Sequence, residues 1–160
     1  MRKQKIYLDT SIIGYLHQES QAEKMSETQE LWKQIKNGVY EVVISDLLLV
    51  ELSNNPNEAI KNKLLGFLSE IKYKIAGITS ETERLAVRIV AQGILTQKNY
   101  NDCLHIAIAL VNDCNLLVSW NFKHLVNIRT INGVRAISSL EGYRSIDIVS
   151  PTFLVQEGDE

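Results

Sequence analysis

The sequence predicts an α/β fold in which a largely parallel sheet carries helices on both faces. Short β-branched apolar runs recur along the chain, and segments with helix start signals separate them. Strands that alternate with helices pair in parallel, because each helix returns the chain to the same end of the sheet. At 160 residues, 45% of them hydrophobic, the chain has the size of one domain with its own core.

Five apolar runs are predicted to form the strands. They cover residues 6–11, 42–45, 74–78, 116–119 and 146–149. Right-handed crossovers with a reversal after the first strand would place the first and fourth strands side by side. Ligands of open α/β sheets bind beyond the carboxyl ends of the strands at such a switch point, so we expect a crevice between Asp9 and Asn121.

Helices are expected between the strands, wherever a capping residue precedes an apolar periodicity. Their predicted starts are Ser26, Asp46, Asn55, Thr79, Asn99 and about Val134. The first of these helices should turn Trp32 and Ile35 inward and end at Gly38.

Composition excludes several classes of protein. A net charge of −2 and a pI of about 5.9 argue against holding nucleic acid mainly through a general positive field. No apolar segment approaches a bilayer span and no signal peptide is visible, so we expect a cytoplasmic protein without a membrane partner. One domain is expected over residues 1–152, with a flexible tail at 153–160 whose last part, 156–160, looks disordered.

The two cysteines are expected to be free, buried thiols. Cys103 and Cys114 lie in or at the end of one predicted helix, about 16 Å apart. That distance is beyond the reach of a disulfide, and neither cysteine has a partner at zinc-site spacing. Free thiols suit a reducing compartment.

Three acids are predicted near the carboxyl-end edge of the sheet. Asp9 ends the first strand, Glu51 lies about two turns into the helix after the second, and Asp102 opens the helix that leads to the fourth. Asn121 follows the fourth strand. Oxygen ligands from separate elements around one crevice are what a hard divalent cation requires.

Each of these residues also has a structural interpretation. Asp9 could cap a turn, Asn121 could be a turn residue, and Asp102 could simply favour the positive end of its helix. Glu51 is harder to explain this way, because acids among apolar residues are rarely buried without a partner or a metal. His105, one turn past Asp102, could support that carboxylate through a polar contact.

Other catalytic templates do not match. No glycine-rich phosphate loop follows the first strand, since residues 10–16 hold only Gly14. Ser11 lacks the elbow glycines of a hydrolase nucleophile. The acid pair of a receiver-type phosphoacceptor is absent as well.

Four segments in order resemble the PIN domain family, the metal-dependent ribonuclease fold that includes the VapC-type toxins of toxin–antitoxin pairs. The segments are Leu8-Asp9-Thr10-Ser11, Ile44-Ser45 with Leu49-Val50-Glu51-Leu52, Asn101-Asp102-Cys103-Leu104-His105-Ile106-Ala107, and Leu117-Val118-Ser119-Trp120-Asn121-Phe122-Lys123. The resemblance runs from Ile6 to about Pro151. It implies a three-layer α/β/α sandwich with a five-stranded, mostly parallel sheet, commonly dimeric.

The resemblance also implies roles for single residues. Asp9, Glu51 and Asp102 would hold Mg²⁺ or Mn²⁺, and Asn121 would fill the fourth polar position of the catalytic site. The residues expected to bind substrate, in part through hydrogen bonds to a carboxylate, water or phosphate, are Thr10, Ser11, Ser119 and Lys123.

Two functions follow as hypotheses. The first is a metal-dependent endoribonuclease acting on RNA, which as the toxin of a toxin–antitoxin pair would have an antitoxin partner. The second is a catalytically weakened PIN domain that binds RNA or protein as a regulatory module. The second arises because many active members carry an additional Asp where this chain has Asn121, and an amide supplies no charge to a cation.

Overall fold

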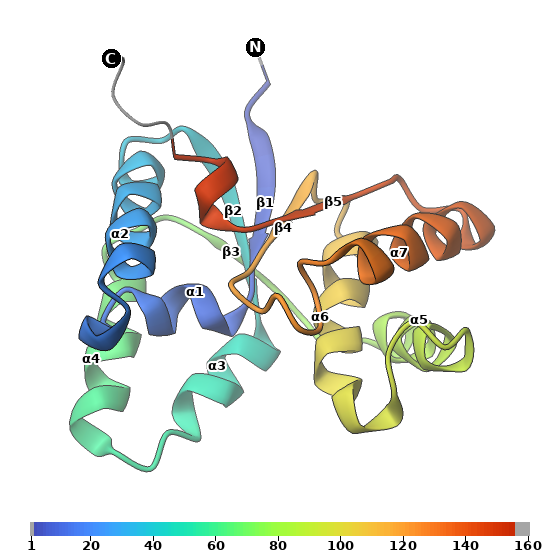
Figure 1. The fold of residues 1–160 in the computed structure, drawn as a ribbon, viewed down its shortest axis with the longest axis horizontal. Coiled ribbons are helices and arrows are strands. Elements are labelled where there is room, and N and C mark those ends of the chain that lie inside the picture. The colour runs from blue at the N-terminus through green and yellow to red at the C-terminus, as the bar shows by residue number, and fades with distance from the viewer. Residues whose placement is uncertain (1, 156–160) are drawn as a thin grey trace.

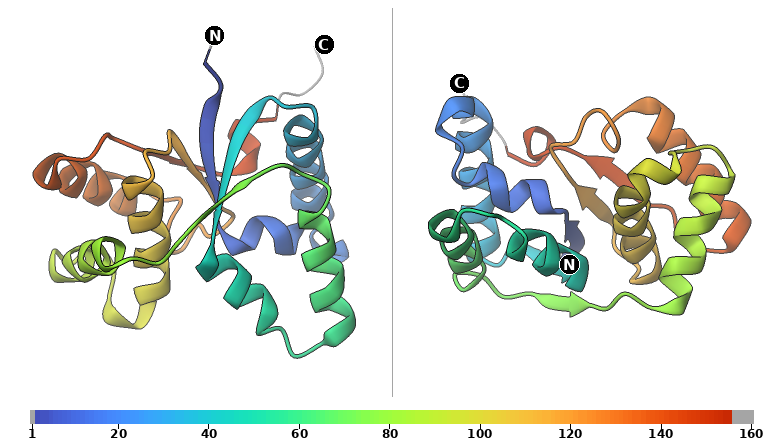
Figure 2. Two further views of the ribbon diagram at one scale, coloured as in Figure 1. Left: turned by 180° about the vertical axis from the view of Figure 1, so that it is seen from behind. Right: turned by 90° about the horizontal axis from the view of Figure 1, so that it is seen from below.

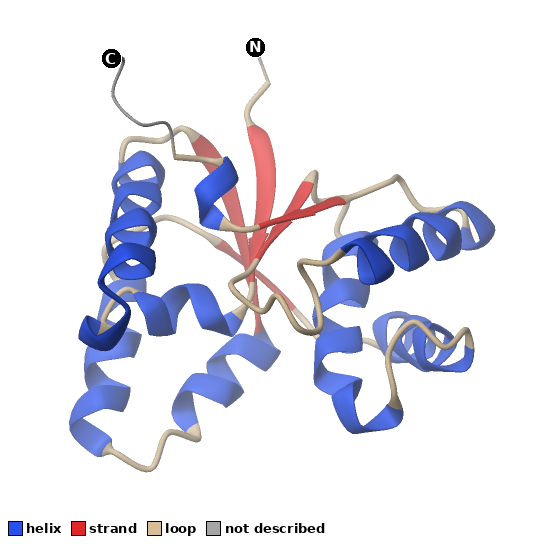
Figure 3. Cartoon of the chain, viewed as in Figure 1, coloured by secondary structure: helices blue, strands red, loops and turns tan. Residues whose placement is uncertain are grey.

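A five-stranded parallel sheet forms the centre of the computed structural model, which describes residues 2–155 (Figures 1 and 3). The strands are β1 (Gln4–Leu8), β2 (Tyr40–Ser45), β3 (Lys74–Ala76), β4 (Leu116–Val118) and β5 (Asp147–Val149). Their order is β3-β2-β1-β4-β5, and every neighbouring pair is parallel. The predicted α/β fold with five parallel strands is confirmed.

Helices cover both faces of the sheet (Figures 1 and 2). One face carries α1 (Thr10–Tyr15), α2 (Ala22–Lys36), α3 (Asp46–Ser53) and α4 (Glu58–Leu68). The other carries α5 (Ser80–Ala91), α6 (Tyr100–Val111) and α7 (Ile128–Glu141). Short 3₁₀ turns lie at η1 (Glu19–Gln21), η2 (Gln97–Asn99) and η3 (Pro151–Phe153). No helix among the described residues is long and apolar enough to span a bilayer.

Successive side chains of a strand point to opposite faces of the sheet. The apolar residues of a strand therefore pack alternately into the two cores, one on each face. In β1, Ile6 and Leu8 pack into the core beneath α1, α2, α3 and α4. Tyr7 between them faces the second core, beneath α5, α6 and α7. All three side chains have no solvent exposure, so β1 is buried on both faces at the centre of the sheet.

The strand order reverses at β1: β2 and β3 are added on one side of it, and β4 and β5 on the other. Leu8 pairs with Val118, and the Asp9 amide donates to the Val118 carbonyl at 3.3 Å. The expected adjacency of the first and fourth strands is therefore confirmed. Their carboxyl ends meet at one edge of the sheet, which is the switch point of this topology.

Several local boundaries differ from the sequence predictions. β1 ends at Leu8, one residue before the expected end at Asp9, and residues 10–15 form the short helix α1, for which no element was predicted. α2 begins at Ala22 and not at Ser26. Its fully buried residues begin only at Thr28, so the turn before Ser26 lacks the buried apolar face by which the helix was predicted. Asn57, not Asn55, caps α4, since its Oδ1 accepts from the Ile60 amide at 3.1 Å.

Other local predictions are confirmed. Trp32 and Ile35 are buried, and Gly38 follows the end of α2 in a left-handed conformation with φ of 80°. Thr79 forms a reciprocal capping box with Thr82 at the start of α5.

The two thiols are buried and free. Burial is the main cause that raises the pKa of both Cys103 and Cys114 to about 12. Of the expected tail, residues 156–160 lie outside the described part of the chain, while Leu154 and Val155 pack against the core of the α1 to α4 face.

Candidate active site

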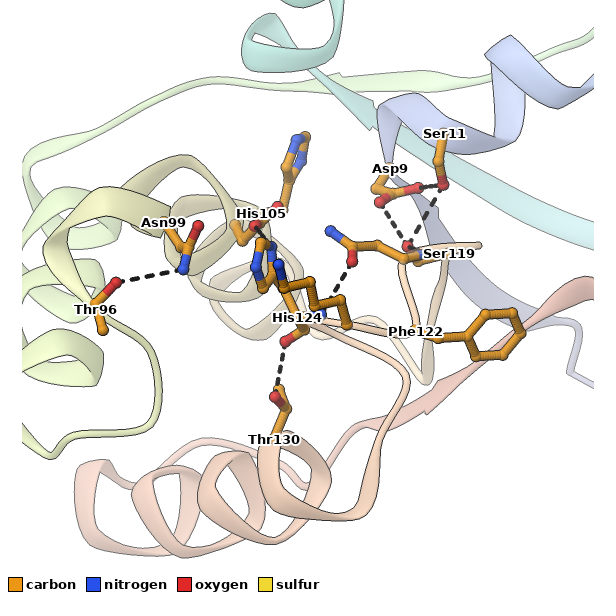
Figure 4. A network of polar contacts seen from close by, with 12 residues as sticks. Asp9, Ser11, Thr96, Asn99, His105, Ser119, Phe122, His124 and Thr130 are labelled. Carbon is orange, nitrogen blue, oxygen red and sulfur yellow. Dashed lines mark hydrogen bonds and ion pairs between the residues drawn. The ribbon is translucent and has the colours of Figure 1, made fainter.

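Asp9 lies directly after β1 and is only 4% exposed. The Ser11 hydroxyl donates to its Oδ1 and the Ser119 hydroxyl donates to its Oδ2, each at 2.6 Å (Figure 4). The two serines come from the ends of neighbouring strands, so the β1–β4 pairing itself orients the carboxylate. Both serines are among the predicted substrate-binding residues, and in the structure they hold a carboxylate.

The pKa of the Asp9 carboxyl is raised above its ordinary value. Burial is the main cause, and the charge of Asp102 adds to it. The charge of His105 and the two serine hydroxyls lower the pKa in part. No Lys or Arg among residues 2–155 forms an ion pair with Asp9. An acid held charged in such a place lacks a counter-ion, which is the electrostatic condition that favours a bound cation.

Glu51 reaches the same edge of the sheet from α3. Its Oε1 accepts from Thr10 Oγ1 at 2.6 Å and lies 2.7 Å from His105 Nε2. Burial raises the pKa of this carboxyl, but the hydrogen bond and charge of His105, with the Thr10 hydroxyl, outweigh it and lower the pKa. Glu51 is therefore held as a carboxylate, and Nε2 of His105 donates to it.

His105 belongs to a chain of polar groups that runs into the core. Its Nδ1 contacts the Tyr7 hydroxyl, which in turn lies 2.7 Å from Ser45 Oγ. The expectation that His105 supports Asp102 through a polar contact is wrong, since its hydrogen bonds go to Glu51 and Tyr7. One turn of helix separates His105 from Asp102, but the ring turns toward α3.

Asp102, in the first turn of α6, is hydrogen bonded to His124 instead. Its Oδ2 lies 2.9 Å from His124 Nδ1. Burial raises the pKa of Asp102, the charges of His124 and His105 lower it in part, and the charge of Glu51 raises it. Asp102 is thus linked electrostatically to Asp9, whose pKa its charge raises, and to Glu51, whose charge raises its own pKa.

Asn121 has a turn role in the structure. Its Oδ1 accepts from the His124 amide at 3.0 Å, and its own amide donates to Ser119 Oγ at 2.9 Å. The loop after β4 is thereby tied to the serine that holds Asp9. Lys123 is exposed and lines a cavity of about 220 Å³ together with His124 and Arg129.

The carboxylate oxygens of the three acids are ligands of the kind that a hard cation prefers. Their side chains are not, however, close enough together to form a complete metal site. Within residues 2–155, no three acidic, histidine or cysteine side chains meet closely enough to form one. The hydrogen bonds of Glu51 and Asp102 go to Oε1 and Oδ2, so Oε2 and Oδ1 have no hydrogen-bond partner in the described chain. Each of these two acids thus keeps an oxygen that a cation could take.

Two residues of the site, His124 and Tyr7, were not predicted from the sequence. His124 lies 22 positions from Asp102, and no spacing rule links a loop histidine to a helix start that far away. Tyr7 sits in an apolar strand, where an aromatic residue is ordinarily core. The sequence did hold one signal. It has only three histidines, and two of them were available as partners for Glu51 and Asp102, acids for which no partner had been predicted with certainty.

The parallel sheet and the three carboxylates at its β1–β4 edge define an α/β domain with an acidic site at the switch point. The sequence profile of the PIN domain matches residues 6–123, which is most of the chain. The chain belongs to the PIN domain family.

Solved structures with the same fold include VapC proteins. The chain matches VapBC2 from Rickettsia felis, bound to a DNA fragment from its promoter, with a TM-score of 0.59 and 15% identity over 92% of this chain and 98% of that one. VapC20 from Mycobacterium tuberculosis, a sarcin-ricin loop cleaving toxin, matches with a TM-score of 0.58 and 13% identity over 88% and 98% of the two chains. A toxin–antitoxin complex from Klebsiella pneumoniae matches with a TM-score of 0.55 and 17% identity over 77% and 92%. No curated protein matches the chain in sequence.

Proposed function

We propose that this PIN domain is a metal-dependent endoribonuclease. The observation that carries the proposal is Asp9, a buried acid at the end of β1 that has no Lys or Arg partner among the described residues. It is electrostatically linked to Asp102 and is held by Ser119, at the start of the loop after β4. Family membership supports phosphodiester chemistry, since PIN domains generally use divalent metal ions.

Asp9, Glu51 and Asp102 would hold Mg²⁺ or Mn²⁺. When bound, the cation would lower the pKa of a water and stabilise charge on the phosphate that is attacked. The residues around the acids fix their orientation: Ser11 and Ser119 for Asp9, His105 and Thr10 for Glu51, and His124 for Asp102. Lys123, exposed at the rim, would meet the RNA backbone.

Cleavage of RNA tests the proposal. Wild type should cleave structured or unstructured RNA with Mg²⁺ or Mn²⁺ and lose this activity in EDTA, while Asp9→Asn should lose at least about 100-fold in rate. Asp113→Asn is the matched control, because Asp113 is exposed and has a left-handed φ of 55° that Asn tolerates well. No metal-dependent cleavage of any RNA, or equal rates for wild type and Asp9→Asn, would contradict the proposal.

The second candidate is a weakened PIN domain that binds RNA or protein without turnover. Two observations favour it: the donors do not form a finished metal group within residues 2–155, and the Asn121 oxygen is already used by the His124 amide. It predicts weak or no Mn²⁺ binding by calorimetry with RNA or protein binding retained. A micromolar Mn²⁺ affinity that Asp102→Ala abolishes would exclude this candidate.

An antitoxin partner and a homodimer complete the proposal. Two of the structures that share the fold are toxin–antitoxin assemblies by description, which supports a search for a partner protein. Expression of wild type should slow growth, Asp9→Asn should not, and the product of a neighbouring small gene should relieve the effect.

Sedimentation of the purified chain tests whether it forms the proposed homodimer. Two buried free thiols support a cytoplasmic location.

A further inference from the structure

Three aromatic rings and one lysine gather beside Asp9, and we call Tyr15, Trp120, Phe122 and Lys24 the aromatic platform. The Trp120 ring is 6.1 Å from the Phe122 ring in an edge-on arrangement and 5.8 Å from the Tyr15 ring, centroid to centroid. Lys24 Nζ lies over all three rings, 5.4 to 5.6 Å from their centroids. Each of these contacts is within the range of a cation–π interaction.

The platform is joined to the acid site by hydrogen bonds. The Trp120 amide donates to Ser11 Oγ at 2.9 Å, and the same hydroxyl donates to Asp9. The Trp120 indole donates to Thr28 Oγ1 at 2.8 Å, which fixes the ring against α2. Phe122 follows Ser119 by three residues, so its backbone lies within about 11 Å of a residue that touches Asp9.

Phe122 is the outward member of the platform. It is 45% exposed, whereas Trp120 beneath it is 5% exposed. Figure 4 shows the Phe122 ring directed away from His124 and His105. The loop that carries the ring is braced, because the Phe122 amide donates to the Trp120 carbonyl at 3.0 Å and Asn127 Nδ2 donates to the Phe122 carbonyl at 2.9 Å. A ring held open to solvent on a braced loop is a prepared contact surface.

We propose that Phe122, the exposed ring of the aromatic platform, stacks an unpaired nucleobase of the RNA, next to the phosphate that would be cleaved at the acid site. This inference rests on the proposed ribonuclease function and adds the residue that contacts the base. Single-stranded nucleic acid is commonly held by aromatic side chains on which bases stack, with nearby cations following the backbone. A base inside a duplex is stacked on its neighbours, so Phe122 selects single-stranded segments and loops.

Charge favours RNA over a protein partner at this surface. Lys24 forms no ion pair with any residue between 2 and 155, and the exposed Lys123 follows Phe122 in the chain. The protein as a whole has a net charge of −2 and does not attract a polyanion. These two lysines, which have no carboxylate partner among the described residues, provide local positive charge beside the exposed ring and would attract the RNA backbone there. A partner protein that covered one exposed ring would gain little apolar area from it.

Binding of short RNAs to non-cleaving protein tests the inference. We would measure fluorescence anisotropy with a labelled single-stranded RNA and its duplex, using Asp9→Asn with EDTA so that no cleavage intervenes. Adding Phe122→Ala should weaken single-strand binding at least about fivefold and leave duplex binding unchanged, and Phe122→Trp should restore it. Lys24→Met should lower the salt dependence of single-strand binding, by about 0.7 in the log–log slope.

Phe153→Ala is the matched control. Phe153 is 74% exposed on η3, and none of the aromatic or cation contacts of the platform includes it. Its removal should leave RNA binding unchanged. Equal single-strand affinity with and without the Phe122 ring overturns the inference, and a partner protein then becomes the candidate occupant. If RNA binding depends on Phe122 but the wild-type protein cleaves no RNA, the ribonuclease proposal is overturned. The inference that Phe122 stacks an unpaired base would then stand on its own.

Discussion

His105 Nε2 lies 2.7 Å from Glu51 Oε1, and this contact links the second core to the edge of the sheet. The ring is almost fully buried and its other nitrogen contacts the Tyr7 hydroxyl. His105 is on α6 and Glu51 is on α3, and these helices cover opposite faces of the sheet. One histidine therefore joins the two layers of helices at the candidate site. The carboxylate is fixed in place by a group that belongs to the fold itself.

Replacing His105 should therefore affect both stability and Glu51. His105→Gln should lower the free energy of unfolding by about 1–3 kcal/mol, because a buried hydrogen-bonded pair loses its geometry. The pKa of Glu51 should rise, since burial would no longer be opposed by the imidazole. Urea unfolding measures the first effect, and carboxyl-carbon NMR titration measures the second. His17→Gln, which changes a partly exposed histidine at the end of α1, should change neither.

Asp9 should reduce the stability of the metal-free protein at neutral pH. Because burial raises its pKa in the folded state, the folded protein binds this proton more tightly than the unfolded chain does. Stability then falls as the pH rises from the ordinary aspartate pKa, about 4, through the raised value. Each unit of increase in the pKa costs about 1.4 kcal/mol at neutral pH.

Asp9→Asn should thus be more stable than wild type at pH 7, and the difference should shrink as the pH falls toward the ordinary aspartate pKa. Thermal unfolding between pH 4 and pH 8 in EDTA gives the comparison. Asp113→Asn removes a charge at an exposed turn, so its effect should not depend on pH in this window. A less stable Asp9→Asn protein at pH 7 would mean that the two serine hydroxyls outweigh burial.

Divalent ions should reverse this order of stability. A ligand that binds only the folded state stabilises it by about 2.7 kcal/mol at 100 times its Kd. Mn²⁺ should therefore raise the melting temperature of wild type and leave Asp9→Asn nearly unchanged. Equal shifts in the two proteins would show that the ion binds elsewhere, and a parallel titration with NaCl at matched ionic strength controls for screening.

Local sequence signals predicted the parts of the fold that depend on neighbouring residues. The apolar run that stops at Asp9 marked the end of β1 closely, and Thr79 marked the start of α5. The adjacency of β1 and β4 followed from right-handed crossovers and one reversal, which are general properties of parallel sheets. These features needed no knowledge of which side chains meet.

The side chains that meet at the site were less predictable. His124 contacts Asp102 only because the loop after β4 folds back over the start of α6, which no local pattern encodes. The His105 ring is fixed by partners on both nitrogens, Glu51 at Nε2 and the Tyr7 hydroxyl at Nδ1, and both partners are distant in the sequence. α1 was not predicted, because it has only six residues, Gly14 among them. So short a segment does not show whether its apolar residues follow the period of a helix or of a strand.

Gly133 marks a close approach between α7 and the segment after α5. A Cβ at this position would lie 2.7 Å from Ile94 Cγ1 and 3.0 Å from Ile94 Cγ2. Gly133→Ala should destabilise the protein by about 1–3 kcal/mol, because the clash exceeds the gain of up to about 1 kcal/mol in helix propensity. In an Ile94→Ala background the same change should become neutral or stabilising. Denaturant unfolding of the four proteins measures this double-mutant cycle, and additive effects would contradict the contact.

Asn121 follows Ser119, whose hydroxyl holds Asp9, by two residues, and we expect Asn121→Asp to raise the affinity for Mn²⁺. The new carboxylate can still accept the His124 amide through Oδ1, so the turn after β4 should persist. A further negative oxygen near Asp9 and Asp102 should tighten Mn²⁺ binding about tenfold by calorimetry, and should destabilise the metal-free protein through repulsion of like charges. Asn115→Asp is the matched control, since Asn115 Oδ1 likewise accepts a backbone amide, from Lys5, but at the opposite end of β4. An unchanged Mn²⁺ affinity in Asn121→Asp, with the fold intact, would mean that this position does not face the cation and that Asn121 serves the turn alone.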